Sequence, residues 1–440
     1  MSIELFSQGT NYTLYKGSML DMLEVIQPCS IDSIVTDPPY ELNFMNKGWD
    51  NSGIAFKATT WKRCFDALKP GGYLLAFGGS RTYHRIACAI EDAGFEIRDT
   101  IMWLYGSGFP KSMNIGLAID KKNGVESEVV GYLDSTMPDF IDAGKKNSVN
   151  KIGINDGESA DRIKQLIYRA QNEWDGWGTA LKPAYEPIIV ARKPCEGSAT
   201  DNVLKYGVGG INIDECRIPM NSDDFDKLQA KSSKNPTNNY NNNPAKKYGD
   251  YNLNIATKPS EDGRFPSNVI LTYDETDEKE VCGGMLSDEG SAARYFYCAK
   301  ASNRDRDEGL HEFMEQRKSG YGYDKGYMNA GEGMFKERQT LKRNIHPTVK
   351  PTLLMEYLVR LVTPKGGTVL DPFNGSGSTG KATMYENCDR CADYKYIGIE
   401  LSEEYLAISN ARIGYAAKDV APVAVPTKPI TKGTVKHSLF

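Results

Sequence analysis

Short apolar runs alternate with segments of helical spacing along the first part of the chain. The runs at 31–36, 73–77 and 96–104 are rich in β-branched or aromatic residues, which predicts buried strands. Segments 61–68 and 82–92 instead repeat apolar residues with the period of a helix. Neighbouring parallel strands need a crossover connection, which is usually a helix. The alternation therefore predicts an α/β protein with a mainly parallel sheet.

The same alternation returns late in the chain. The spacing predicts a helix over 352–362, strands over 367–370 and 395–400, and a helix over 402–412 with Ser402 as its N-cap. Because strands and helices again follow one another, we expect this part of the chain to complete the sheet that begins upstream.

The middle of the chain is less regular. Within 105–180 the pattern predicts a helix over 159–172 and a turn at Trp174–Trp177, and a buried strand follows at 187–192.

From residue 196 to 345 the composition shifts towards asparagine, glycine and tyrosine. Residues 220–260 fit a disordered insert and a substrate-contacting module equally well. The apolar runs at 265–271 and 293–297 predict strands, so we expect the insertion as a whole to be a folded module.

Composition and charge narrow the class of protein. Of its 440 residues, 40% are hydrophobic and 25% charged, which suits roughly two or three globular domains. No apolar run reaches the roughly 18 residues of a membrane span, and the first residues lack the features of a secretory signal. Nine scattered cysteines favour free thiols in a reducing cytoplasm. A net charge of −5 means that a nucleic-acid partner requires basic side chains gathered on one face.

A glycine-rich stretch follows the strand predicted at 367–370. Residues 375–381 match the start of the phosphate-binding loop of nucleotide hydrolases, but Ala382 stands where that loop needs a hydroxyl for magnesium. In a second interpretation, one strand ends at Asp371, a tight glycine turn follows, and the next strand ends at Glu400. An acid so placed binds ribose hydroxyls in dinucleotide folds, which suits an adenosine without requiring phosphates. A close-packed turn without a ligand is the structural alternative.

A second motif, Asp37-Pro38-Pro39-Tyr40, follows the strand predicted at 31–36. Its prolines fix φ and carry no N–H donor, so an acid, a proline carbonyl and an aromatic ring are presented together at a strand end. A planar ring with an amino substituent would need these groups. A rigid turn without chemistry is the alternative.

Four motifs together resemble those of the amino-methylating DNA methyltransferases. In chain order they are Asp37–Tyr40, His346–Pro351, Asp371–Thr379 and Ile397–Leu401. The catalytic motif precedes the glycine loop, with a variable insert between them, as in the beta class of that family. The chain looks most like the site-specific enzymes of phages and prophages. The resemblance covers roughly 1–195 and 295–415, and it implies a Rossmann-like methyltransferase fold that binds S-adenosylmethionine.

The resemblance also implies roles for single residues. Asp37, Pro38, Pro39 and Tyr40 would form the catalytic motif. The implied S-adenosylmethionine contacts are His346, Thr348 and Lys350 at the methionine end, Glu400 at the ribose, and Asp371, Phe373, Gly375, Ser376 and Gly377 in the loop.

An aromatic amine is a poor nucleophile because its lone pair is delocalised into the ring. In the implied mechanism the Asp37 carboxylate and the Pro38 carbonyl accept the amino hydrogens, Tyr40 stacks on the ring, and the nitrogen attacks the methyl carbon in line. The target base must first flip out of the duplex. An aspartate at position 37 favours the 6-amino group of adenine. The 4-amino group of cytosine and a nucleotide hydrolase are the alternatives.

The predicted organisation is a catalytic domain in two parts, 1–195 and 346–418. A target-recognition insertion, 196–345, separates them, although 295–345 alternatively rejoins the core, and 419–440 form a flexible tail. The expected partner is double-stranded DNA, and no association with a membrane is expected. A homodimer is one arrangement that the sequence leaves open. The expected location is the cytoplasm of a bacterium or of a phage-infected host cell.

Two weaker signals remain. Cys388 and Cys391 are a lone pair of thiols, whereas a structural zinc site needs four ligands, so no metal is predicted. Basic side chains suit contacts with DNA phosphates, although a solvated surface is the alternative. The candidates for such contacts are Lys246, Lys247, Arg338, Lys342 and Arg343.

Overall fold

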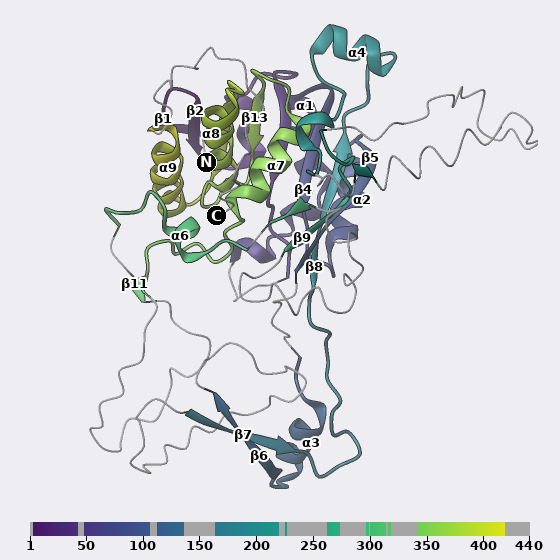
Figure 1. Ribbon diagram of the computed structural model, residues 1–440, viewed down its shortest axis with the longest axis vertical. Helices are drawn as coiled ribbons and strands as arrows, with labels where there is room; N and C mark the ends of the chain where they lie inside the picture. The colour runs from purple at the N-terminus through teal and green to yellow at the C-terminus, as the bar shows by residue number, and fades with distance from the viewer. Residues whose placement is uncertain are drawn as a thin grey trace, which may run out of the picture. The chain divides into compact units, whose positions relative to one another are not determined.

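The computed structural model of the chain forms two compact units, Met1–Met102 with Pro187–Phe440, and Trp103–Glu186 (Figure 1). We treat each unit by itself. The residues that the structure describes are 3–42, 48–105, 112–135, 163–219, 225–226, 262–272, 296–298, 300–313, 316–317 and 341–418.

A mainly parallel sheet organises the larger unit. In the described part of the chain its strands, in sheet order, are β1 (Glu4–Gln8), β2 (Tyr12–Lys16), β14 (Lys395–Glu400), β13 (Thr368–Asp371), β3 (Ile31–Thr36), β4 (Leu68–Phe77), β8 (Tyr185–Arg192), β5 (Glu96–Tyr105), β9 (Val269–Thr272) and β10 (Phe296–Tyr297). Strands β2, β14, β13, β3 and β4 run parallel to their neighbours in that order. Strand β1 runs antiparallel to β2, and β8 runs antiparallel to β4.

Helices cover both faces of this sheet. All six residues of β3 are buried, and successive side chains of a strand point to opposite faces. Ile34 joins the apolar core that contains Trp61 of α1 (Ala58–Ala67). Ser33 points the other way, and its Oγ lies 2.8 Å from Oγ1 of Thr363, which follows α7 (Thr352–Val362). Helices α1 and α7 therefore lie on opposite faces.

Helices α7, α8 (Ser378–Arg390) and α9 (Glu403–Lys418) lie side by side on one face (Figure 1). The remaining helices of the larger unit in its described residues are η1 (Met19–Glu24), η3 (Gly48–Asn51), η4 (Ile54–Phe56), α2 (Tyr83–Asp92), α4 (Ala199–Tyr206), η5 (Asp214–Cys216) and α6 (Asn303–Asp307). Two short strands, β11 (Gln316–Arg317) and β12 (Leu341–Lys342), pair antiparallel. A mainly parallel sheet with helices on both faces confirms the predicted Rossmann-like architecture.

The smaller unit corrects one prediction. The helix expected over 159–172 is wrong, because β7 (Ile163–Arg169) is a strand that pairs antiparallel with β6 (Glu128–Ser135). Cross-strand pairs such as Val129 with Tyr168 stabilise this pair of strands, and such pairing overrides a local helical pattern. Helix α3 (Ile115–Asn123) precedes both strands.

Several other elements follow the prediction, but the strand predicted from residue 265 begins only at Val269, and the helix predicted over 402–412 runs from Glu403 to Lys418. Helix α7 spans 352–362 as expected, and the Ser402 Oγ accepts a hydrogen bond from the Tyr405 N–H at 3.3 Å, which confirms Ser402 as the cap of α9. Strand β4 begins at Leu68 rather than at residue 73. No described helix is long and apolar enough to cross a membrane.

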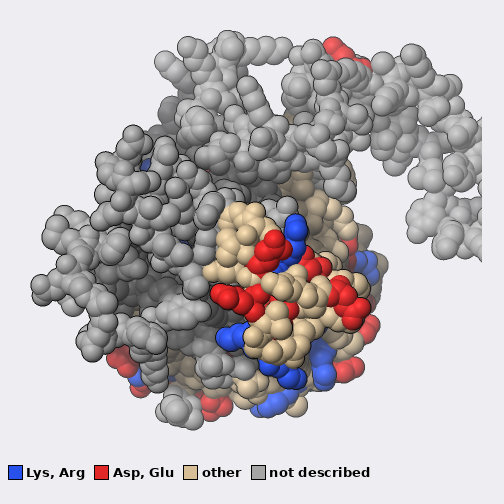
Figure 2. All heavy atoms as spheres, turned by 90° about the horizontal axis from the view of Figure 1, so that it is seen from below, with Lys and Arg blue, Asp and Glu red and all other residues tan. Residues whose placement is uncertain are grey.

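The predicted insertion at 196–345 stays a prediction, and its candidate phosphate contacts Lys246, Lys247 and Arg338, like the tail 419–440, lie outside the described residues. Figure 2 shows one face of the molecule, on which basic and acidic side chains are interspersed over the described part. That visible part of the face has no broad area of one charge.

Candidate active site

The carboxyl ends of four parallel strands meet at one edge of the larger unit's sheet. Strands β14, β13, β3 and β4 are neighbours in this order. Three of the predicted site acids stand there, since Glu400 and Asp371 end β14 and β13, and Asp37 follows β3. Ligands of open α/β sheets bind outside this edge. The two motifs that the sequence separates by more than 300 positions therefore meet at one place.

Lys350 lies against the catalytic motif. Its Nζ donates to Asp37 Oδ2 at 2.7 Å and to the Tyr40 hydroxyl at 3.1 Å, and it lies 4.8 Å from the centre of the Phe77 ring. Only 8% of the Lys350 side chain is exposed, so solvent screens this ion pair weakly. The structure thus places the Lys350 ammonium on the acid of the catalytic motif, while its predicted contact with the methionine end of the donor stays a prediction.

The backbone after Tyr40 is held by two carboxylates. Asp50 is buried and accepts the N–H groups of Glu41 at 2.9 Å and Leu42 at 3.2 Å. The Glu41 carboxylate in turn accepts the Gly53 N–H at 2.8 Å. Glu41 has a φ of +56°, which is uncommon outside glycine. These bonds hold the chain in that turn and fix the position of Tyr40.

Asp371 anchors the start of the glycine loop. Its carboxylate accepts the hydroxyl of Thr36 at 2.6 Å, the hydroxyl of Thr379 at 2.7 Å and the Phe373 N–H at 3.1 Å. Burial raises the pKa of Asp371 to about 6, and the nearby charge of Asp37 adds to this rise. Its oxygens are thus engaged within the protein, where they tie β3, β13 and α8 together.

The glycine loop turns at two residues in the left-handed region, Gly375 with φ of +50° and Gly377 with φ of +74°. Glycine adopts this region without steric cost. Glu400 closes the loop from the neighbouring strand: its Oε2 accepts the Gly375 N–H and its Oε1 the Ser402 N–H, both at 2.9 Å. Burial raises the pKa of Glu400.

His346 lies over this loop. A Cβ atom on Gly375 would stand 2.9 Å from the His346 Nε2, so the ring and the loop backbone are in close contact. The His346 Nδ1 lies 2.9 Å from the Thr348 carbonyl oxygen. Burial lowers the pKa of His346 to about 3, so the ring is neutral at pH 7. Nδ1 then donates to Thr348, and Nε2 is an acceptor at the loop. The Thr348 residue itself is exposed.

Two further predicted contacts support the loop from behind. The Phe373 ring packs on Trp61, with the ring centres 6.2 Å apart. Ser376 is buried, and its carbonyl oxygen and Oγ accept from Arg412 Nη1 at 2.7 and 3.2 Å.

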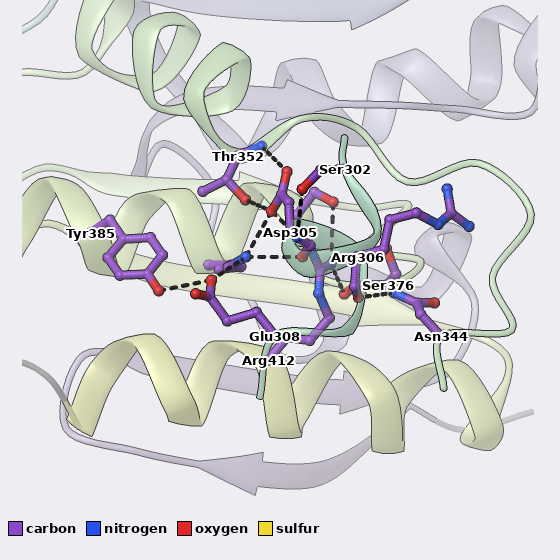
Figure 3. A network of polar contacts seen from close by, with 11 residues as sticks. Ser302, Asp305, Arg306, Glu308, Asn344, Thr352, Ser376, Tyr385 and Arg412 are labelled. Atoms are coloured by element: carbon purple, nitrogen blue, oxygen red, sulfur yellow. Dashed lines mark hydrogen bonds and ion pairs between the residues drawn. The ribbon is translucent and has the colours of Figure 1, made fainter. Parts of the chain in front are cut away.

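Lys381, the last residue of the glycine-rich stretch, has ion-pair partners that the sequence did not predict. This residue is fully buried, and its Nζ lies 2.8 Å from Asp305 Oδ1 and 2.7 Å from Glu308 Oε2. Figure 3 shows these two acids. In a phosphate-binding loop the equivalent lysine reaches phosphate oxygens. Here the amine is committed to two carboxylates, which argues against the nucleotide-hydrolase alternative. Asp305 and Lys381 are 76 positions apart, so no local pattern signals the pair.

The two cysteines considered as metal ligands, Cys388 and Cys391, have no assigned role. Cys388 and Cys391 lie at the end of α8, and Cys391 is exposed. Within the described residues, no group of three or more His, Cys, Asp or Glu side chains is arranged to hold a metal ion.

Residues 31–411 match the protein family described as DNA methylase. The chain belongs to the DNA methylase family. This match spans both motifs and the whole edge of the sheet at which they meet.

Among curated relatives of this family member is the type II methyltransferase M.ScaI of Streptomyces caespitosus, 32% identical over 84 residues, or 19% of this chain and 26% of that protein. The DNA adenine methyltransferase YhdJ of Escherichia coli (strain K12) is 34% identical over 82 residues, or 18% of this chain and 26% of that protein. The matched segments thus span about a quarter of these relatives. Among solved structures, PvuII DNA methyltransferase (cytosine-N4-specific) has 14% identity and a TM-score of 0.41, over 92% of this chain and 87% of that one.

Proposed function

We propose that this DNA methylase is a site-specific enzyme of the beta class that transfers a methyl group from S-adenosylmethionine to the 6-amino group of adenine in duplex DNA. One observation carries the proposal. The Asp37 motif and the glycine loop leave adjacent parallel strands, and the Thr36 hydroxyl bonds to Asp371 at 2.6 Å between them. A donor at the loop and an acceptor at Asp37 would then lie side by side.

The residues of the loop suit this methyl donor. Gly375 and Gly377 make the tight turn that presents the loop backbone at the sheet edge, and the places of their missing Cβ atoms face His346 and Ser409. The Glu400 carboxylate, which ends the strand beside the loop, would accept a ribose hydroxyl in addition to the N–H groups that it already holds. The neutral His346 adds an acceptor beside Gly375. S-adenosylmethionine, when bound, supplies an electrophilic methyl group.

The catalytic motif suits an aromatic amine as the acceptor. The Asp37 carboxylate and the Pro38 carbonyl would each accept one amino hydrogen, which frees the nitrogen lone pair from the ring. As the N–C bond forms, the bond between the methyl carbon and the sulfonium sulfur would break, and the sulfur would keep the electron pair. Asp37 would stabilise the positive charge that develops on the nitrogen, and one amino proton would then pass to water. Tyr40 would stack on the base after it has flipped out of the duplex. In this proposal the Lys350 ammonium, which bonds Asp37 Oδ2, holds the carboxylate in place while the carboxylate accepts an amino hydrogen.

Adenine is the preferred target. The relative YhdJ is a DNA adenine methyltransferase, and an aspartate begins the catalytic motif here. The 4-amino group of cytosine is the alternative. We further propose that residues 196–345 recognise the target sequence, that the enzyme is of the phage or prophage type, and that it works in the cytoplasm of a bacterial host, as a monomer or a homodimer.

The test uses the full chain with tritiated S-adenosylmethionine and duplex DNA of mixed sequence, with RNA and protein as parallel acceptors. Nuclease digestion and chromatography then identify the labelled product. We expect label in N6-methyladenine from DNA only. Label in N4-methylcytosine would establish the alternative target. Nucleoside triphosphate hydrolysis without any methyl transfer would overturn the proposal.

A further inference from the structure

Two cations lie buried directly behind the glycine loop. Lys381 on α8 and Arg412 on α9 both have no exposed surface. Arg412 Nη1 donates to the Ser376 carbonyl oxygen at 2.7 Å, and Lys381 donates its backbone N–H to the Gly377 carbonyl oxygen at 2.9 Å. The Arg412 guanidinium thus bonds the loop directly, and Lys381 lies in the first turn of α8, which begins where the loop ends.

The counter-charges come from α6, which belongs to the less regular region of the sequence. Asp305 Oδ1 lies 2.8 Å from Lys381 Nζ and 3.9 Å from Arg412 Nη2, and Glu308 pairs with the same lysine. Attraction to Lys381 lowers the pKa of Asp305 against the opposing effect of its burial. A buried charge that loses its partner is strongly destabilising, so these cations require α6 to stay in place.

The same segment also bonds Thr352 and the backbone of His346; Figure 3 shows Asp305, Arg306 and Thr352. The Asp305 carboxylate accepts the N–H of Thr352 at 3.0 Å and also its hydroxyl. Arg306 Nη2 donates to the His346 carbonyl oxygen at 2.8 Å. Helix α6 therefore joins the loop, the start of α7 and the His346 segment.

We propose that Asp305 is a positioning residue of the methyl-donor site. It touches no donor atom itself. It sets the glycine loop through Lys381 and the His346–Thr352 segment through Thr352, so donor affinity depends on this one carboxylate. The inference rests on the proposed function, because it takes S-adenosylmethionine as the ligand of the loop.

The experiment is calorimetric titration of S-adenosylmethionine into the full chain. We expect Asp305→Asn to raise the Kd about tenfold, because Lys381 keeps only one of its two counter-charges. The KM for the donor should rise in parallel, while kcat at saturating donor stays within about threefold. The control Glu215→Gln removes an exposed ion pair with Arg390 and should bind as the unsubstituted chain does.

A double variant separates positioning from general damage. Asp305→Asn with Lys381→Met removes the unbalanced cation and leaves Arg412 its bond to the backbone oxygen of residue 305, which is 3.2 Å long here. We expect this pair to restore the Kd to within about threefold of the unsubstituted value. If Asp305→Asn does not fold, Thr352→Val serves instead. It removes the hydroxyl bond to Asp305, keeps the backbone N–H bond and all charges, and should weaken binding about threefold.

Unchanged donor affinity in a folded Asp305→Asn, or in Thr352→Val where the first variant does not fold, would overturn the inference and leave the proposed function standing. An equal loss of donor affinity in the double variant would also overturn it. Failure of the unsubstituted chain to bind S-adenosylmethionine would instead refute the proposed function together with the inference.

Discussion

At the scale of single residues, Lys350 determines the state of Asp37 before a substrate arrives. The ammonium bonds both Asp37 and the Tyr40 hydroxyl, so it fixes the acid relative to the aromatic ring. Sequence reasoning placed Asp37 correctly at a strand end. It could not find this partner, because 313 positions separate Lys350 from Asp37.

The first prediction follows from that contact. We expect Lys350→Met to lower kcat about 100-fold, because Asp37 loses the group that orients it. The Kd for S-adenosylmethionine should change little, since the ammonium bonds the catalytic motif and not the loop. Single-turnover methylation and calorimetry measure the two effects separately. A large rise in donor Kd with kcat intact would return Lys350 to the donor site.

At the scale of elements, α7 and α8 meet around a buried carboxyl. Burial raises the pKa of Glu356 on α7 to about 7 from its ordinary 4.5, and the nearby charges of Glu386 and Asp389 on α8 raise it further. The folded state therefore binds this proton more tightly than the unfolded state. The resulting contribution to stability is complete below about pH 4.5 and is lost as the pH rises through about 7.

Glu356→Gln should remove this pH dependence, because glutamine stays neutral. Relative to the unsubstituted chain, the variant should gain about 2 kcal/mol in the free energy of unfolding between pH 5 and pH 8. Denaturant titration at both pH values measures the difference. Glu404→Gln, at an exposed position of α9, is the control and should show no such gain. The expectation would be contradicted if the free energy of unfolding of Glu356→Gln changed with pH as that of the unsubstituted chain does.

Helix α8 also packs closely at Gly380. A Cβ atom there would stand 2.4 Å from Ile413 Cδ1 and 2.5 Å from Tyr396 Cε1. We expect Gly380→Ala to cost about 1–3 kcal/mol, although alanine favours a helix by about 1 kcal/mol. Gly414→Ala on α9 is the matched control, since its Cβ atom would meet only the Tyr12 hydroxyl, at 3.3 Å. Equal thermal stability of the two variants would show that α8 and β14 pack more loosely.

At the scale of the whole molecule, the sequence predicted what local patterns encode. Hydrophobic periodicity located α7 and β14, and their order predicted the parallel sheet and the acids at its edge. Periodicity missed the pairing of β6 with β7, because that pairing depends on contacts between two separate segments and leaves no signal in either segment alone. The ties around Asp305 were missed for the same reason, since they join distant segments.

The two ends of the smaller unit lie close together. Within it, the Tyr105 N–H donates to the Ala184 carbonyl oxygen at 2.8 Å. Replacing residues 106–183 by a short Gly-Ser turn should therefore leave the larger unit folded, with a donor Kd within about threefold of the full chain. Calorimetry tests this. Loss of donor binding in a folded shortened chain would show that the donor site needs the smaller unit.

The central claim is that Asp37 activates an amine beside a methyl donor held by the glycine loop. The most direct measurement compares the full chain with Asp37→Ala, in both donor binding and methyl transfer to duplex DNA. The account predicts that the variant binds S-adenosylmethionine normally and loses transfer by about 1000-fold or more. Methyl transfer by Asp37→Ala at the rate of the unsubstituted chain would contradict it.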